Sequence, residues 1–84
     1  MKFTPIDCRI MVLEAQNENA RGNYESARKQ LEELLIIEGD RGFFRLAQDG
    51  PHLTKIIAEA EEKIRRNTEE INALRQIEEY ANQN

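Results

Sequence analysis

The sequence has no tryptophan, one cysteine, one histidine, two prolines, and among its 84 residues only two tyrosines and three phenylalanines. A single cysteine, Cys8, cannot form an internal disulfide, which excludes a disulfide-stapled scaffold. A structural zinc site needs about four ligands, more than one cysteine and one histidine supply. We therefore expect neither a metal nor a cofactor, and we expect Cys8 to be a buried structural thiol in a reducing compartment.

Long apolar runs and blocks of one charge sign are also missing. No stretch of about 18 apolar residues occurs, and the N-terminus lacks the hydrophobic segment of a secretory signal. These absences predict a soluble, cytoplasmic protein with no membrane contact. The 12 basic and 16 acidic residues are interleaved and give a net charge of −4. Binding to nucleic acid is not expected, because it requires a concentrated basic face.

Catalytic motifs are missing as well. The chain contains no phosphate-binding loop, no H-E-x-x-H, no C-x-x-C and no G-x-S-x-G. His52 has Asp49 nearby in sequence but lacks the further titratable or metal-ligating residues that a general base or a metal site needs. We therefore interpret it as a solvated residue at a helix start. The sequence therefore predicts a protein that is not an enzyme.

What the sequence does contain is helix signals. Thr4 suits an N-cap, Pro5 the first helical position, and Asp7 the third residue after the cap, which predicts a helix over residues 5–20. Apolar residues of this helix form two nearly opposite stripes, Ile6, Ile10, Leu13 and Ala20 on one side and Cys8, Met11, Val12 and Ala15 on the other. A helix that is apolar on two sides packs between two neighbours, either both in one small bundle or one of them a partner.

A second helix is predicted over residues 24–38. Gly22 suits the left-handed position after a helix end and Asn23 the next N-cap, so the two helices should fold back as an antiparallel hairpin. The apolar face of the second helix comprises Tyr24, Ala27, Leu31, Leu34 and Leu35. Gly22, Asn23 and Tyr24, with the residues that follow, resemble the second half of a tetratricopeptide repeat. No second copy recurs, and such repeats need about three units, so we interpret the match as a generic helix-turn-helix.

A short connecting segment lies between two glycine-containing breaks, at residues 39–42 and 49–51. We predict a short helix over residues 41–48 rather than a strand, because an isolated two-stranded ribbon is marginal. Phe43 and Phe44 are expected to cover the apolar residues Ile36 and Ile37 at the end of the hairpin.

The third predicted helix is the longest, over residues 51–81. Its apolar residues follow alternating four- and three-residue steps, a heptad-like seam that comprises Leu53, Ile57, Ala60, Ile64, Asn67, Ile71, Leu74 and Ala81. At 1.5 Å per residue this helix would be roughly 46 Å long, against roughly 24 Å for each hairpin helix. We therefore expect the surplus seam to bury itself against another chain, through Ile57, Ile64, Asn67, Ile71, Leu74 and Ile77. Asn67 either fixes the register of that interface or is solvated.

Taken together, these features predict an all-α protein with an antiparallel helical hairpin, a short connecting helix and a long C-terminal amphipathic helix. The expected function is non-enzymatic protein–protein interaction by surface occupancy, as an adaptor, a chaperone or an oligomerising subunit, with a homodimer or another protein as partner. One alternative is a phage- or plasmid-type inhibitor that blocks an enzyme or a defence complex. A second alternative is an oligomeric binder of small anions or nucleotides that uses Arg41 and Arg45, beside Phe43 and Phe44, together with Lys55. The same arginines and phenylalanines are also candidates for a contact with a protein partner. Arginines so placed more commonly lie over neighbouring aromatic and carboxylate groups.

Overall fold

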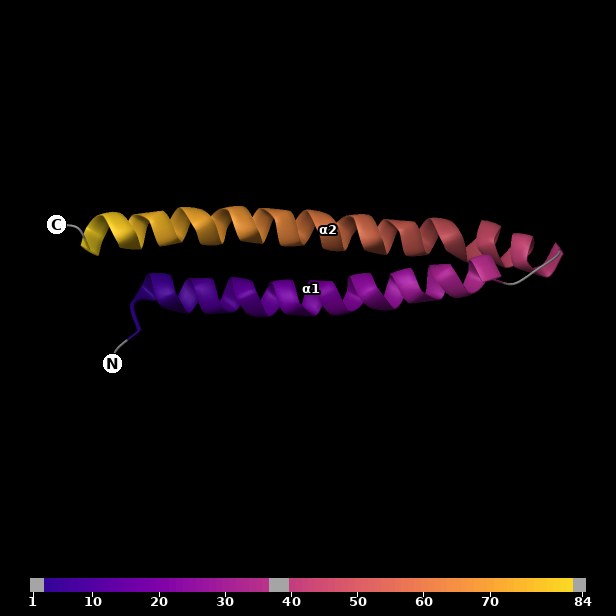
Figure 1. Ribbon diagram of the computed structural model, residues 1–84, viewed down its shortest axis with the longest axis horizontal. Helices are drawn as coiled ribbons and strands as arrows, with labels where there is room; N and C mark the ends of the chain where they lie inside the picture. The colour runs from indigo at the N-terminus through magenta and orange to yellow at the C-terminus, as the bar shows by residue number, and fades with distance from the viewer. Residues whose placement is uncertain (1–2, 37–39, 83–84) are drawn as a thin grey trace.

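The chain folds into two long helices that lie side by side and run in opposite directions (Figure 1). A computed structural model describes residues 3–36 and 40–82, and the side chains of 40–43 are left out of the description. Helix α1 spans Pro5–Ile36 and helix α2 spans Asp40–Asn82. Within the described residues there is no strand, so the all-helical prediction is confirmed. The molecule is a rod of 65 × 20 × 15 Å with both termini at one end.

Helix α1 begins as the sequence predicts. The backbone N–H of Asp7 donates to Thr4 Oγ1 at 3.1 Å, and the Thr4 N–H donates to Asp7 Oδ2 at 3.1 Å. This reciprocal pair occupies backbone donors that have no partner inside the helix. Pro5 is the first helical residue, where its missing N–H costs nothing.

The break predicted at Gly22 and Asn23 is wrong, because α1 continues through both residues and merges the helices expected over 5–20 and 24–38. The helix continues because an uninterrupted row of residues that face α2 extends on both sides of Gly22. Its members alternate in steps of four and three residues: Ile10, Leu13, Asn17, Ala20, Tyr24, Ala27, Leu31 and Leu34, all buried or half-buried. A helical glycine costs about 1 kcal/mol, which packing along this row readily offsets. The turn on which the tetratricopeptide resemblance rested is therefore not formed.

The break predicted before residue 51 is also wrong, since α2 joins the segments expected over 41–48 and 51–81. Pro51 lies inside α2 and is exposed. Gly50 is buried and lies on the same face of the helix as the seam residues. A proline within a helix removes one hydrogen bond and crowds the preceding turn, which bends the helix. In Figure 1 the first, pink turns of α2 are offset from the rest of the helix.

The core consists of two apolar clusters between the helices. One, nearer the termini, contains Ile10, Leu13 and Ile71, with Ile6 and Leu74 packed against it. The other contains Ala27, Leu34 and Leu53, with Leu31, Leu46, Ile56 and Ile57 packed against it. The seam of α2 is thus buried against α1 of the same chain.

This packing corrects the argument for a surplus seam on α2. With 32 residues, α1 is roughly 48 Å long, so it covers most of the 43-residue α2. Ile71 is buried, and Ile57, Ile64, Asn67 and Leu74 are half-buried within the single chain. Of the six seam residues expected to meet a partner, only Ile77 is exposed, at 54%.

The prediction that Phe44 covers Ile36 is wrong, because both side chains are exposed. Phe44 is 73% exposed and Ile36 is 76% exposed. Phe44 belongs to the first turns of α2, ahead of the bend, and does not cover Ile36. The predictions for Arg41, Phe43 and Ile37 lie outside the residues whose side chains are described.

Candidate interaction surface

A polar layer of four residues separates the two apolar clusters. The side-chain amide of Asn67 donates to Gln16 Oε1 at 3.2 Å, and the amide of Asn17 donates to Thr68 Oγ1 at 3.4 Å. Asn67 therefore finds a polar partner, but within its own chain. The sequence analysis did not identify Asn17 as a buried residue. Its spacing from Ile10 and Leu13, which places all three on one face of the helix, could have indicated this.

Within the part of the chain that the structure describes, two ion pairs cross between the helices, one on each side of the seam. Arg9 Nε lies 2.7 Å from Glu70 Oε2, and Arg75 lies 2.8 Å from Glu14 Oε1. The hydrogen bond to Glu70 raises the pKa of Arg9 above its ordinary value. Each exposed pair contributes little free energy, but the two together favour one register between the helices.

The solvent face of α2 is densely charged. Arg65 and Arg66 both donate to the Glu62 carboxylate, at 3.0 and 2.8 Å, which lowers the pKa of Glu62 to about 2. Arg65 also pairs with Glu69 at 2.7 Å. This face is therefore suited to water and not to an apolar partner.

Near the termini, two carboxyl groups from opposite helices meet. The hydrogen bond between Asp7 and Glu78 raises the pKa of Glu78, and the same bond, together with the Thr4 contacts, lowers the pKa of Asp7. Two carboxylates share such a bond only when one of them is protonated. Where both carboxyl groups are ionised, the pair is instead a source of repulsion.

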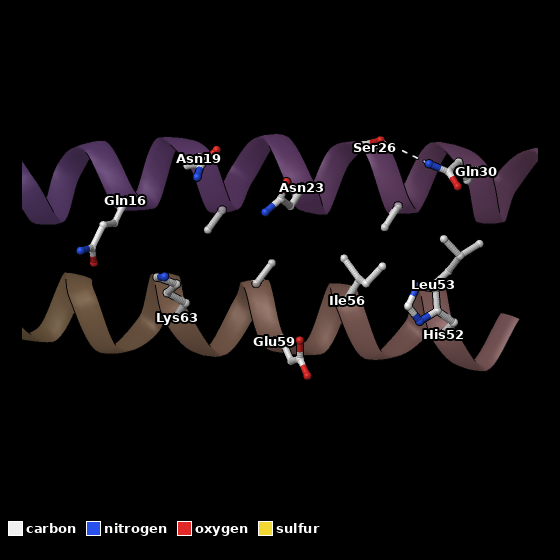
Figure 2. Close-up of a pocket in the computed structure, with 13 residues that line it drawn as sticks. Gln16, Asn19, Asn23, Ser26, Gln30, His52, Leu53, Ile56, Glu59 and Lys63 are labelled. Atoms are coloured by element: carbon white, nitrogen blue, oxygen red, sulfur yellow. Dashed lines mark hydrogen bonds between the residues drawn. The ribbon is translucent and has the colours of Figure 1, made fainter. Parts of the chain in front are cut away.

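A groove of about 570 Å³ runs along one side of the helix pair (Figure 2). From α1 it receives five uncharged polar residues, Gln16, Asn19, Asn23, Ser26 and Gln30. Its other lining residues are Ala20, Ala27, His52, Leu53, Ile56, Glu59, Ala60 and Lys63. Figure 2 shows Leu53 and Ile56 of α2 directed toward α1. Small side chains in this lining leave the hollow between the helices.

The second apolar stripe predicted on the first helix remains uncovered by α2. Cys8, Met11, Val12 and Ala15 are all exposed, Met11 at 53% and Val12 at 48%. The expectation that Cys8 is buried is therefore wrong, because α2 covers only the opposite side of α1. The stripe continues at heptad steps as an uncharged row that we call the outer strip: Cys8, Val12, Ala15, Asn19, Gly22 and Ser26.

Further apolar side chains are exposed at the two ends of the rod. Leu35, Ile36 and Phe44 lie at the end where the helices are joined, and Phe3, Ile77 and Tyr80 lie toward the end that carries the termini. Exposed fractions among these six range from 54% to 76%.

The predicted anion site receives little support from its described members. Arg45 is exposed and lines a hollow of about 480 Å³ together with Glu33, Asp49 and His52. Two carboxyl groups in the same hollow would repel a small anion. Among the side chains that the structure describes, no group of three or more His, Cys, Asp or Glu could hold a metal ion.

Comparison with known proteins found no matching family model, no matching curated protein and no matching solved structure. Within residues 3–36 and 40–82, neither helix has the length of apolar sequence that a bilayer crossing requires.

Proposed function

We propose that this protein is a non-enzymatic, cytoplasmic protein–protein interaction module that contacts its partner through the outer strip of α1 and the adjoining Met11. The observation that supports it is the apolar surface left exposed after the two helices have packed together. Met11 and Val12 are about half exposed on the first half of α1, on the side away from α2. A helix that remains apolar on a second side is expected to acquire a second neighbour.

We further infer that the chain is an antiparallel coiled coil, which makes it a rigid carrier for this surface. Inward positions on both helices alternate in steps of three and four residues, and among the residues whose side chains the structure describes they alone are buried. The two ion pairs across the helices lie on the flanks of the seam, where a coiled coil places its charged residues. A preorganised rod loses little conformational entropy on binding.

Surface occupancy of this kind serves an adaptor, a chaperone or an inhibitor that covers a site on an enzyme or a defence complex. All three roles require the same contact, a helix laid along the outer strip. An anion-binding function is less favoured, because Glu33 and Asp49 accompany Arg45 in its hollow.

Photo-crosslinking in cells tests this proposal. A photoreactive amino acid replaces Val12 in one variant and Ala58 in another, since Ala58 is exposed on α2. We expect protein adducts from position 12 at several times the yield from position 58. Equal yields, or no adduct from position 12, would show that the outer strip is not a contact surface.

A further inference from the structure

We propose that the helix pair contains a register lock. The polar layer between the two apolar clusters, together with the Arg9–Glu70 ion pair, holds α1 and α2 in the observed register against a second register that is shifted by one heptad. In the shifted register, each residue of α1 would lie opposite a residue of α2 that is seven positions nearer the start of that helix. The movement along the rod is roughly 10 Å.

The apolar part of the seam would tolerate this shift. Steps of four and three residues repeat every seven residues, so a shift of one heptad brings inward positions opposite other inward positions. Apolar residues would still meet apolar residues at five levels: Ile6 opposite Ile71, Leu13 opposite Ile64, Ala20 opposite Ile57, Tyr24 opposite Leu53, and Leu31 opposite Leu46. Because apolar burial is not directional, these levels distinguish the two registers only weakly.

The lengths of the helices also permit the shift, but in one direction only. Helix α2 has 43 residues against 32 in α1, and its first turns extend past the end of α1 where the helices are joined (Figure 1). These turns carry the half-buried Leu46 and the exposed Phe44, so a shift of α1 toward them would bring more of α1 alongside apolar surface. A shift the other way would set Leu13 against Glu78 and leave Ile6 past the end of α2.

The polar layer opposes the shift, because its hydrogen bonds exist in the observed register alone. Asn17, which is 3% exposed, and Asn67, which is half-buried, each donate a hydrogen bond across the helix pair, at 3.4 and 3.2 Å. After the shift, Asn17 would lie opposite Ala60 and Asn67 opposite Ile10. Both hydrogen bonds would be lost at levels where a buried polar group without a partner is costly.

Charge opposes the shift as well. Arg9 Nε lies 2.7 Å from Glu70 Oε2 in the observed register, whereas the shift would bring Arg9 beside Lys63, a like charge. The side chains nearest to replace the lost partners of the two amides would be Arg9 and Glu61. Both are exposed and would have to give up contact with water to reach the seam.

Two spin labels report the register. In a Cys8→Ser background, Lys29→Cys on α1 and Ala73→Cys on α2 provide the labelling positions, which are exposed and outside the polar layer. The shift would move position 29 away from position 73 and lengthen the distance between the labels by roughly 10 Å. Double electron–electron resonance measures this distance, and circular dichroism of each variant confirms that helicity is retained.

The lock is challenged with Arg9→Glu, because a carboxylate at position 9 repels Glu70 in the observed register and attracts Lys63 in the shifted one. With the polar layer intact, we expect Arg9→Glu to keep the single short distance. With Asn17→Leu and Asn67→Leu added, both registers have apolar residues at these levels, and a second distance roughly 10 Å longer should appear.

The short distance alone in both variants would overturn the lock. The longer distance from Arg9→Glu with the polar layer intact would also overturn it, because the layer would then not hold the register. Apart from Cys8→Ser, none of these substitutions lies in the outer strip, so the result is independent of whether that strip contacts a partner.

Discussion

Asn17 and Thr68 meet across the helix pair, where the Asn17 amide donates to the Thr68 hydroxyl at 3.4 Å. Asn17 is only 3% exposed, and among the described residues its Oδ1 accepts no hydrogen bond. A buried acceptor without a partner costs about 1–3 kcal/mol. A polar residue retained in such a row commonly fixes register at the expense of stability.

Replacement of Asn17 by leucine should therefore stabilise the protein. Asn17→Leu removes the unpaired acceptor and joins the two apolar clusters, and we expect a gain of about 1–2 kcal/mol in the free energy of unfolding. For a domain of this size each kcal/mol raises Tm by about 4–8 °C. Thermal unfolding followed by circular dichroism measures the shift. A lower Tm would mean that the amide itself stabilises the helix pair.

Core packing predicts the opposite effect at a neighbouring position. Leu13 is 1% exposed, so Leu13→Ala should leave a cavity and lower stability by about 2–5 kcal/mol. The matched control is Leu35→Ala, the same change at a residue that is 64% exposed, with an expected effect within about 0.5 kcal/mol. Urea denaturation of both variants measures the difference. Similar losses for the two would contradict the placement of the core.

The sequence predicts the all-α class and the Thr4 cap, because both depend on local signals. It fails at Gly22, where a residue typical of helix ends occupies an exposed position in a continuous helix. The row of inward positions crosses Gly22 unbroken, but Asn17, Ala20 and Ala27 make it weakly apolar. Whether the helix continues through Gly22 depends on contact between the two helices, which local sequence does not reveal.

The continuity of α1 through Gly22 can be tested by substitution. If Gly22 lies in a continuous helix, Gly22→Ala should raise stability by about 0.5–1 kcal/mol, because alanine is the better helix former. If the chain turned there with a left-handed backbone, the same change would lower stability. Thermal unfolding should be measured at low concentration, so that self-association does not contribute. A decrease in Tm would restore the helix-turn-helix interpretation.

The carboxyl pair of Asp7 and Glu78 predicts a pH dependence of stability. Because the pKa of Glu78 is raised in the folded state, its stabilising contribution is complete below its unfolded pKa and is lost as pH rises through the raised value. The lowered pKa of Asp7 acts in the opposite sense, since its contribution is lost as pH falls through the lowered value. The pair is therefore most favourable with Glu78 protonated and Asp7 ionised, and least favourable where both carboxyl groups are ionised and repel each other. Glu78→Gln should raise Tm where wild-type Glu78 is ionised, and the gain should shrink as pH falls through the raised pKa of Glu78 and the wild-type carboxyl group takes up its proton. Glu79→Gln, at an exposed neighbour, changes net charge equally and should show no such trend, so equal behaviour of the two variants would attribute the effect to net charge alone.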